Sequence, residues 1–196
     1  MRLRVLGSAD FRVMPWKDGG GVTTELLIHP EGATVAGGFL WRLSRATVSA
    51  SGPFSAFPGM DRSLCVLSGE LAVDLDGAEA AVLRPGSGIL RFSGDRVASG
   101  RVLRGPVEDF NVISDRRRVR HDLCRLSGPD VALPDAPFRI LAALGGVTEV
   151  RGVRVEPGGL LRVEGAGPLT ARVEGEALLV RVHPLEQVAE VRDSAS

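Results

Sequence analysis

The residues of this 196-residue chain that are best suited to binding or catalysis are charged side chains set among aromatic and apolar neighbours. The segment MPWKDGGGVTTE places Trp16, Lys17 and Asp18 directly before three glycines, and it ends at Glu25. Lys17 is the only lysine among 24 basic residues. Lysine is a compact charge, whereas arginine is a larger planar fork. Our hypothesis is therefore that arginine cannot occupy the place of Lys17.

Three later segments combine charged and apolar residues in the same way. FLWRLSRA, GPFSAFPGMDR and VEDFNVISDR contribute, in that order, Arg42 and Ser44, Asp61 and Arg62, and Asp109 and Asn111. A barrel interior that holds Lys or Arg must pair it or offer it to an anionic guest, because a lone buried charge is costly. The sequence therefore predicts a pocket for a small acid.

Within this pocket we assign Lys17 and Arg42 to pairing with the anion and Trp16 to the wall. Asp109 and Asn111 are two residues apart in a strand-like segment, so both side chains are expected to face one cavity. Asp61 and Arg62 form either an internal ion pair or a purely structural one. Two roles are open for Glu25 as well: it pairs with Lys17 or an arginine across the sheet, or it is only structural.

The glycine triplet has two open interpretations. It is not a phosphate-binding loop, which needs its glycines before the lysine and a helix after it. Gly19 and Gly20 instead permit positive φ and close backbone approach, with amides that an anion could reach. The alternative is a plain structural turn.

No cofactor or metal is expected. His29, His121 and His183 each stand alone, without the spacing of metal ligands. Cys65 and Cys124 form neither a disulfide framework nor a zinc pattern, so we expect reduced thiols. No nucleophile motif is present to support an acyl-transfer triad, so catalytic residues are not assigned.

The elements that must position these residues are predicted to be strands. Hydrophobic residues alternate with period two, and 25 glycines and 12 prolines interrupt them at short intervals, which is typical of an all-β sandwich or barrel. The predicted strands cover 38–48, 62–68, 70–77, 80–86, 88–95, 96–104, 109–113, 138–143, 147–155, 169–174 and 177–182. One short helix is predicted at 183–194.

A weak internal repeat indicates two related β-units. LRPGSGILRFSGD at 83–95 resembles VEPGGLLRVEGAG at 155–167, and each reads as strand, Pro-Gly turn and strand. The basic run SDRRRVRHD at 114–122 falls between the halves, and we interpret it as a solvated connector. The expected division is 1–115 for the first barrel and 116–196 for a smaller second one, packed as one compact unit.

The overall charge excludes some classes of partner. The formal net charge is zero, so no global field favours nucleic acid or an anionic membrane. No apolar stretch resembles a signal peptide or a membrane span. We therefore expect a soluble cytoplasmic protein whose partner is a small carboxylate, with no nucleic acid and no membrane.

Together, MPWKDGGGVTTE, FLWRLSRATV, GPFSAFPGMDR and DFNVISDR resemble the HutD family, most strongly over residues 13–116. The resemblance implies a cupin-like jelly-roll fold in a two-barrel (bicupin) arrangement. It also implies an association with histidine utilisation, in which the protein binds an intermediate such as formylglutamate or urocanate and limits flux. Cupin-like barrels often pair through their sheets, so a homodimer is an open alternative. The family usually has asparagine at the position of Asp18, which puts the ligand preference in question.

Three functions compete at this point. The leading hypothesis is a ligand-binding regulator of histidine breakdown without turnover. The second is a metal-free isomerase or hydrolase that uses Lys17 with Asp109 or Glu25. The third is a protein-interaction module, which an exposed apolar patch around Phe54, Phe57 and Met60 would favour.

Overall fold

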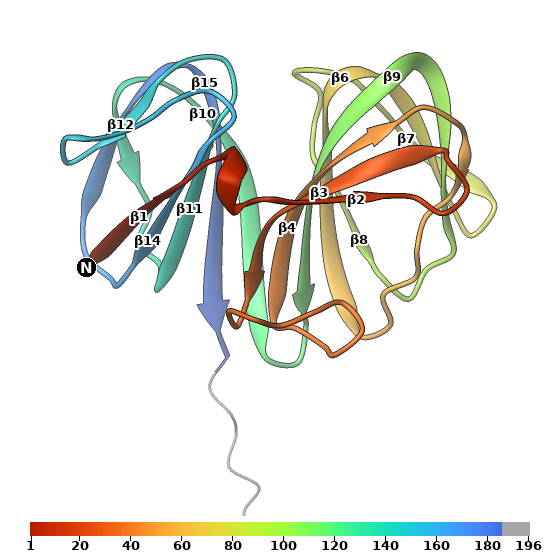
Figure 1. Cartoon of the computed structure of the whole chain (residues 1–196), viewed down its shortest axis with the longest axis horizontal. Coiled ribbons are helices and arrows are strands. Elements are labelled where there is room, and N and C mark those ends of the chain that lie inside the picture. Colours follow the sequence, from red (N-terminus) through yellow and green to blue (C-terminus); the bar gives the residue numbers. More distant parts are fainter. Residues whose placement is uncertain (186–196) are drawn as a thin grey trace, which may run out of the picture.

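The fold is all-β, as predicted, and consists of two sheets. The computed structural model describes residues 1–185. Figure 1 shows the two sheets curling into barrels that stand side by side, with long strands at their junction. One 3-10 turn, η1 (Ser8–Asp10), interrupts the described strands near the N-terminus.

The first barrel is an eight-stranded antiparallel sheet in the order β2-β3-β4-β9-β6-β7, with β5 paired to β9 and β8 to β6. Its strands are β2 (Arg12–Pro15), β3 (Gly21–His29), β4 (Trp41–Val48), β5 (Gly52–Pro53), β6 (Met60–Leu75), β7 (Ala78–Leu83), β8 (Leu90–Ser93) and β9 (Ala98–Asp115). The centre of this sheet, β4-β9-β6, holds all the candidate residues of the later three segments.

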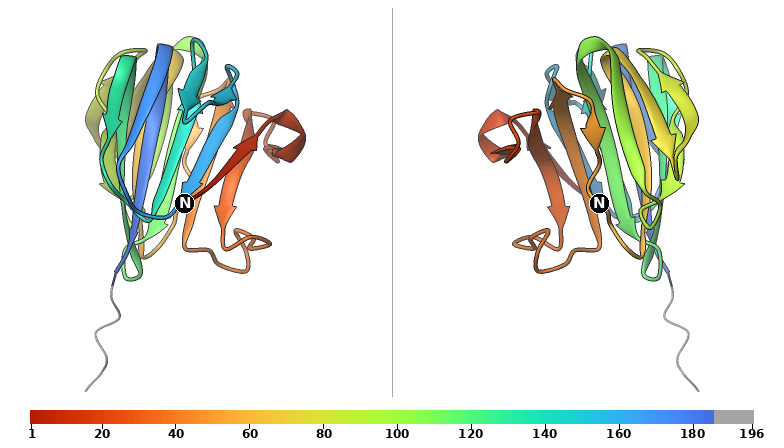
Figure 2. Two further views of the ribbon diagram at one scale, coloured as in Figure 1. Left: turned by 90° about the vertical axis from the view of Figure 1, so that its left-hand side faces the viewer. Right: turned by 90° about the vertical axis from the view of Figure 1, so that its right-hand side faces the viewer.

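The second barrel is a seven-stranded sheet in the order β1-β14-β11-β15-β12-β13, with β10 paired to β15. Its strands are β1 (Arg2–Leu6), β10 (Val119–Leu133), β11 (Phe138–Ala143), β12 (Thr148–Val150), β13 (Val153–Val155), β14 (Leu160–Glu164) and β15 (Leu169–Pro184). The N-terminal strand β1 thus pairs with β14, although the expected division grouped it with the first barrel. In both views of Figure 2 the N-terminal segment projects from one side of the molecule.

Bulges explain why three long strands were predicted as pieces. The segments 62–68 and 70–77 form the single strand β6, whose register shifts around Gly69. A Cβ at Gly69 would lie 2.6 Å from the carbonyl oxygen of Arg104, and its φ is +77°, so this bulge needs glycine. In the same way, 96–104 and 109–113 join into β9, and 169–174 and 177–182 join into β15.

The connector prediction for 114–122 was wrong in extent. Strand β9 runs to Asp115 and β10 begins at Val119, so only 116–118 form a turn. Bulges near Gly128 reset the alternation of β10, which hid this strand in the sequence. Of the helix predicted at 183–194, residues 183 and 184 end β15, and the segment from 186 onward lies outside the described residues.

The two barrels are filled differently. Apolar side chains such as Leu141, Leu161 and Leu179 occupy the interior of the second barrel. In the first barrel a comparable cluster with Leu71 and Val73 fills one part. A cavity of about 450 Å³ occupies another part of the first barrel. The repeat maps onto matching connections: Gly86 and Gly158, at the two Pro-Gly turns, have φ values of +75° and +87°.

Candidate ligand-binding site

Three neighbouring strands place polar side chains on the cavity wall in rows. Because strand residues two apart point the same way, β4 presents Arg42, Ser44 and Ala46 to the cavity. The register aligns these residues with Ile113, Asn111 and Asp109 of β9. On the other side of β9, Arg62 pairs with Ile113 and Leu64 with Asn111. One row is therefore Arg42–Ile113–Arg62, the next is Ser44–Asn111–Leu64, and Asp109 stands in the third.

Arg42 is compensated by a carboxylate of its own sheet. Its side chain is nearly buried, and Nε lies 2.6 Å from Oε2 of Glu25 on β3. The sequence left Lys17 or an arginine as the partner of Glu25, and the structure selects Arg42. Arg42 thus reaches the cavity with its charge already balanced by a close ion pair.

Arg62 is the less compensated cation. It is 5% exposed, its Nη1 donates to the carbonyl oxygen of Ser55 at 3.2 Å, and its guanidinium lies over the rings of Phe54, Phe57 and Phe92 at 4.9–5.6 Å. Burial lowers its pKa to about 10, and the charge of Asp109 opposes that change. Arg62 is therefore still a cation at neutral pH. Among the described residues no carboxylate forms an ion pair with it.

Asp109 is a buried carboxyl group with an abnormal affinity for protons. It is 4% exposed, and burial raises its pKa to about 7, although Arg62 and a hydrogen bond from the backbone of Ala46 oppose the rise. Oδ1 of Asp109 has no hydrogen-bond partner, and neither does Oδ1 of Asn111. As expected from their spacing, both residues line the same cavity.

The glycine triplet forms a hairpin turn between β2 and β3. Gly19 donates its N–H to the carbonyl oxygen of Trp16 at 3.1 Å, and Gly20 donates to Oδ1 of Asp18 at 3.0 Å. Both amides are therefore used inside the turn, contrary to the interpretation that an anion could take them. At Gly21 an added Cβ would lie 2.5 Å from the carbonyl oxygen of Thr47 and 3.1 Å from the ring of Trp16, so close packing requires glycine there.

The hairpin turn brings three predicted residues to the edge of the cavity. Trp16 is partly buried and donates its indole N–H to Oγ1 of Thr23 at 2.8 Å, which fixes the ring as a wall. Lys17 is exposed and lines the same cavity. Asp18 accepts the N–H of Gly20 through its carboxylate, so this side chain caps the turn.

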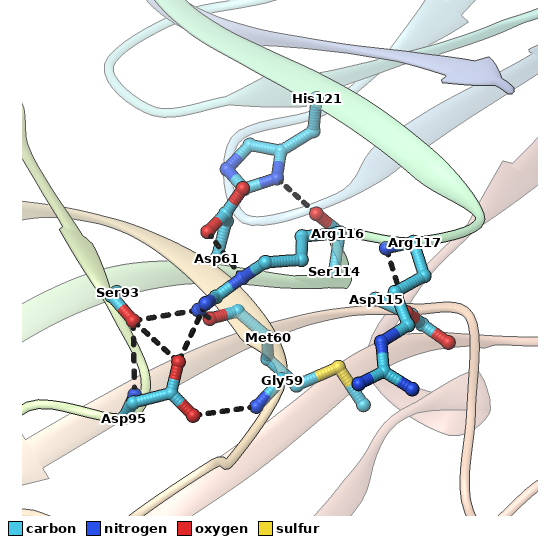
Figure 3. Close-up of polar contacts among 10 residues, drawn as sticks. All are labelled: Gly59, Met60, Asp61, Ser93, Asp95, Ser114, Asp115, Arg116, Arg117 and His121. Carbon is cyan, nitrogen blue, oxygen red and sulfur yellow. Dashed lines mark hydrogen bonds and ion pairs between the residues drawn. The ribbon is translucent and has the colours of Figure 1, made fainter.

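Asp61 lies outside this cavity and does not pair with Arg62. Adjacent strand residues point to opposite faces, so Arg62 faces inward while Asp61 meets Nε of Arg116 at 3.1 Å. Arg116 also contacts Asp95 at 2.6 Å and donates to Oγ of Ser93 at 2.6 Å, a network drawn in Figure 3. Arg116, which belongs to the basic run, thus links β6 and β8 through ion pairs and a hydrogen bond and is not a solvated charge.

His121 joins the two barrels. It lies on β10 of the second barrel, and its ring contacts Oγ of Ser63 at 2.9 Å and Oγ of Ser114 at 2.6 Å, both from the first barrel. Figure 3 shows the contact with Ser114. Burial lowers the pKa of His121 to about 4, so its ring is neutral at pH 7.

Phe54, Ser55 and Phe57 are site residues that the anion argument missed. They precede β6, are separated from Arg62 by only a few residues, and cover its guanidinium. The combination of phenylalanines and a following arginine in GPFSAFPGMDR was the available signal. Phe54 and Phe57 are partly buried, so they do not form the exposed patch that an interaction module would present.

The described residues show neither a metal site nor a membrane-spanning helix. Within residues 1–185, no three His, Cys, Asp or Glu side chains converge as a metal site would require. In the same part of the chain, no helix has the length and apolar character needed to cross a membrane. Cys65 and Cys124 are free thiols.

Two barrels side by side, one with a polar cavity, define the class of cupin-like two-barrel proteins. The bacterial pirin YhhW of Escherichia coli, in complex with nickel(II), has this fold, with a TM-score of 0.63 over 94% of this chain and 100% of that chain. At 13% identity the likeness is one of fold alone.

The profile of the HutD family matches residues 8–180, and the chain belongs to this family. HutD from Pseudomonas fluorescens SBW25, in a structure from a formate condition, is 29% identical with a TM-score of 0.83, covering 94% of this chain and 100% of that chain. A 21.2 kDa protein in the hutC 3′ region of Pseudomonas putida is 35% identical over 188 residues, 92% of this chain and 97% of the relative. Protein Ves of Citrobacter koseri is 30% identical over 146 residues, 72% of this chain and 70% of Ves.

Proposed function

We propose that this protein is a ligand-binding regulator of histidine utilisation that holds a small carboxylate in the cavity of its first barrel. The ligand class is that of formylglutamate and urocanate. Binding, rather than turnover, is the proposed activity, and the bound form would be the signal that limits flux.

The observation that carries this proposal is the environment of Arg62. A buried cation that forms no ion pair is costly, because the free energy of desolvation is not offset. Here the cation faces a cavity of about 450 Å³, large enough for a small acid. A ligand carboxylate would supply the missing charge-assisted hydrogen bonds, which arginine can make in a bidentate manner. Arg42 in the same row and Lys17 at the edge would add to the attraction.

Two relatives support the metabolic context. The P. putida relative belongs to the hutC 3′ region, which fits the association with histidine utilisation that the resemblance to HutD implies. The HutD structure from P. fluorescens covers nearly all of this chain, so the cavity-bearing barrel is part of the shared region.

A thermal-shift screen tests the proposal. The protein is titrated with formylglutamate, urocanate, glutamate and histidine, beside Arg62→Met and the control Arg104→Met, an exposed arginine of β9 that does not line the cavity. At one hundred times its dissociation constant a ligand adds about 2.7 kcal/mol of stability, or on the order of 5–10 °C. We expect a shift in the wild type and the control that Arg62→Met abolishes. No shift with any acid, or a shift retained in Arg62→Met, would contradict the proposal.

Asp109 favours a second candidate function, an isomerase or hydrolase acting on the same small acids. A carboxyl group with a pKa near 7 can both take and give a proton at neutral pH, as general acid–base catalysis needs. The sequence offered Asp109 or Glu25 as the carboxylate that acts with Lys17. Glu25 is paired with Arg42, so Asp109 is the remaining candidate. Incubation of each bound acid with the protein in D₂O, followed by NMR, separates the two functions: unchanged acid supports the regulator, whereas conversion or deuterium incorporation that Asp109→Asn abolishes supports the enzyme.

A further inference from the structure

The cavity contains hydrogen-bond acceptors that the protein does not satisfy. Among the described residues, Oδ1 of Asp109 and Oδ1 of Asn111 are the only carboxylate or amide oxygens that are buried and without a partner. Both lie on β9, two residues apart, and both line the same cavity. Buried acceptors are normally paired, and one left unpaired is costly. Two such oxygens on one cavity wall therefore indicate a missing donor.

These acceptors stand at a fixed distance from the arginines. The row of Arg42 and Arg62 is level with Ile113, whereas Asn111 and Asp109 are two and four residues further along the strand. Inward-facing residues of a strand are about 7 Å apart along the backbone. The Cα atoms of Asn111 and Asp109 are therefore about 7 Å and about 13 Å from the Cα atom of Ile113, which is level with the two arginines. Long arginine side chains shorten the gap that a ligand must span. The cavity wall thus carries cations at one end and hydrogen-bond acceptors at the other.

We propose that Asp109, with Asn111 beside it, recognises an N–H group of the ligand, so that the cavity selects carboxylic acids that also carry a nitrogen-bound hydrogen. This inference rests on the proposed binding of a carboxylate at the arginine row. The class includes N-acylated amino acids and imidazole acids. Plain dicarboxylic acids and oxygen analogues of the same shape are expected to bind more weakly, because they leave both acceptors unpaired.

The orientation of Asp109 favours acceptance over donation. The backbone of Ala46 already donates a hydrogen bond to this carboxyl group, so one of its oxygens is used as an acceptor. Asn111 adds a second acceptor oxygen on the same side. A ligand N–H group at either oxygen would supply the missing donor, while a ligand oxygen there would meet a lone-pair-bearing oxygen. The second arrangement is repulsive unless Asp109 gives up its own proton to the ligand.

Matched pairs of ligands test the inference by calorimetric titration at pH 7.5. Urocanate is compared with 3-(2-furyl)acrylate, whose furan ring has an oxygen but no N–H donor. Formylglutamate is compared with the ester in which oxygen replaces its amide N–H. Each ligand is titrated into wild type, Asp109→Leu and the control Asp61→Asn, whose carboxylate lies outside the cavity. Leucine has a similar size and no acceptor, so it removes the recognition without opening a void.

We expect wild type and Asp61→Asn to prefer each N–H acid over its oxygen analogue about ten- to hundredfold, the range for an unpaired buried acceptor. In Asp109→Leu the preference should fall below about threefold while the furan acid still binds. Equal affinity of the two members of a pair in wild type, or a preference that survives in Asp109→Leu, would overturn the inference and leave carboxylate binding intact. If neither member of either pair binds wild type, the proposed function itself fails. Asp109→Asn serves as a second variant should Asp109→Leu not fold, because it keeps an acceptor but lacks the charge. We expect it to retain a reduced preference, and a preference equal to that of wild type would overturn the inference.

Discussion

Replacement of Asp109 by asparagine should stabilise the ligand-free protein, and the gain should depend on pH in a defined window. The pKa of Asp109 is raised from 3.8 to about 7 by burial. Between these values the folded protein binds more protons than the unfolded chain, so its stability falls as pH rises. The full difference corresponds to about 4 kcal/mol at most, since one pKa unit is worth about 1.4 kcal/mol. Asparagine does not titrate, so Asp109→Asn is free of this loss.

The assay is thermal unfolding of both proteins without ligand, in steps from pH 4.5 to pH 8.5. The difference in Tm, variant minus wild type, should grow from pH 4.5 to about pH 7 and then level off, by an amount on the order of 10 °C for a chain of this size. The opposite contribution of His121 cancels in the difference because both proteins contain it. A difference in Tm that stays constant over this range would refute the argument that Asp109 is buried and uncompensated.

Three further predictions concern the barrel junction, the hairpin turn and the edge of the cavity. The pKa of His121 is lowered to about 4, so its protonation should cost the wild type up to about 3 kcal/mol of stability relative to His121→Gln as pH falls from 6.5 to 4; chemical denaturation of both proteins measures this difference, in which the opposite contribution of Asp109 cancels. Gly21→Ala should lower stability by about 1–3 kcal/mol, seen as a lower denaturation midpoint, whereas Gly7→Ala, where an added Cβ meets nothing within 4 Å, should change it little. Lys17→Ala should weaken carboxylate binding less than Arg62→Met in calorimetric titration, because the exposed lysine is screened by solvent; Lys17→Arg that binds as tightly as wild type would contradict a requirement for lysine.

The sequence predicted the strands of this fold better than their lengths. Alternation of apolar residues predicted the all-β class and most of the strands. Where a bulge inserts a residue, as at Gly69, the alternation is reset and one strand reads as two. Strand β10 was missed for the same reason, and its first residues were hidden further by the basic run. The pairing of β1 with β14 joins chain segments far apart in the sequence, which local pattern does not encode.

For the candidate site, the alternation of residues along a strand predicted which face a side chain occupies, but not which residues form ion pairs. It correctly placed Asp109 and Asn111 on one face, because two residues of one strand need only the pleat. The proposed pair of Asp61 and Arg62 ignored the same rule, since neighbours in a strand point apart. Arg116, the true partner of Asp61, is 55 positions away and meets it only because β9 folds back beside β6.

A comparison of two buried arginines gives the reason for placing the proposed ligand in the first barrel and not in the second. Arg139 of the second barrel is fully buried, and its two terminal nitrogens donate to the carbonyl oxygens of Gly165 and Gly167 at 2.9 and 2.8 Å. Its carboxylate neighbour Asp135 lies 3.6 Å away. Arg62 of the first barrel has one carbonyl contact and faces open space. A buried guanidinium that turn carbonyls and a carboxylate surround is part of the core. One that faces a cavity and an unpaired carboxyl group has hydrogen-bonding capacity left over, which the proposed ligand would use.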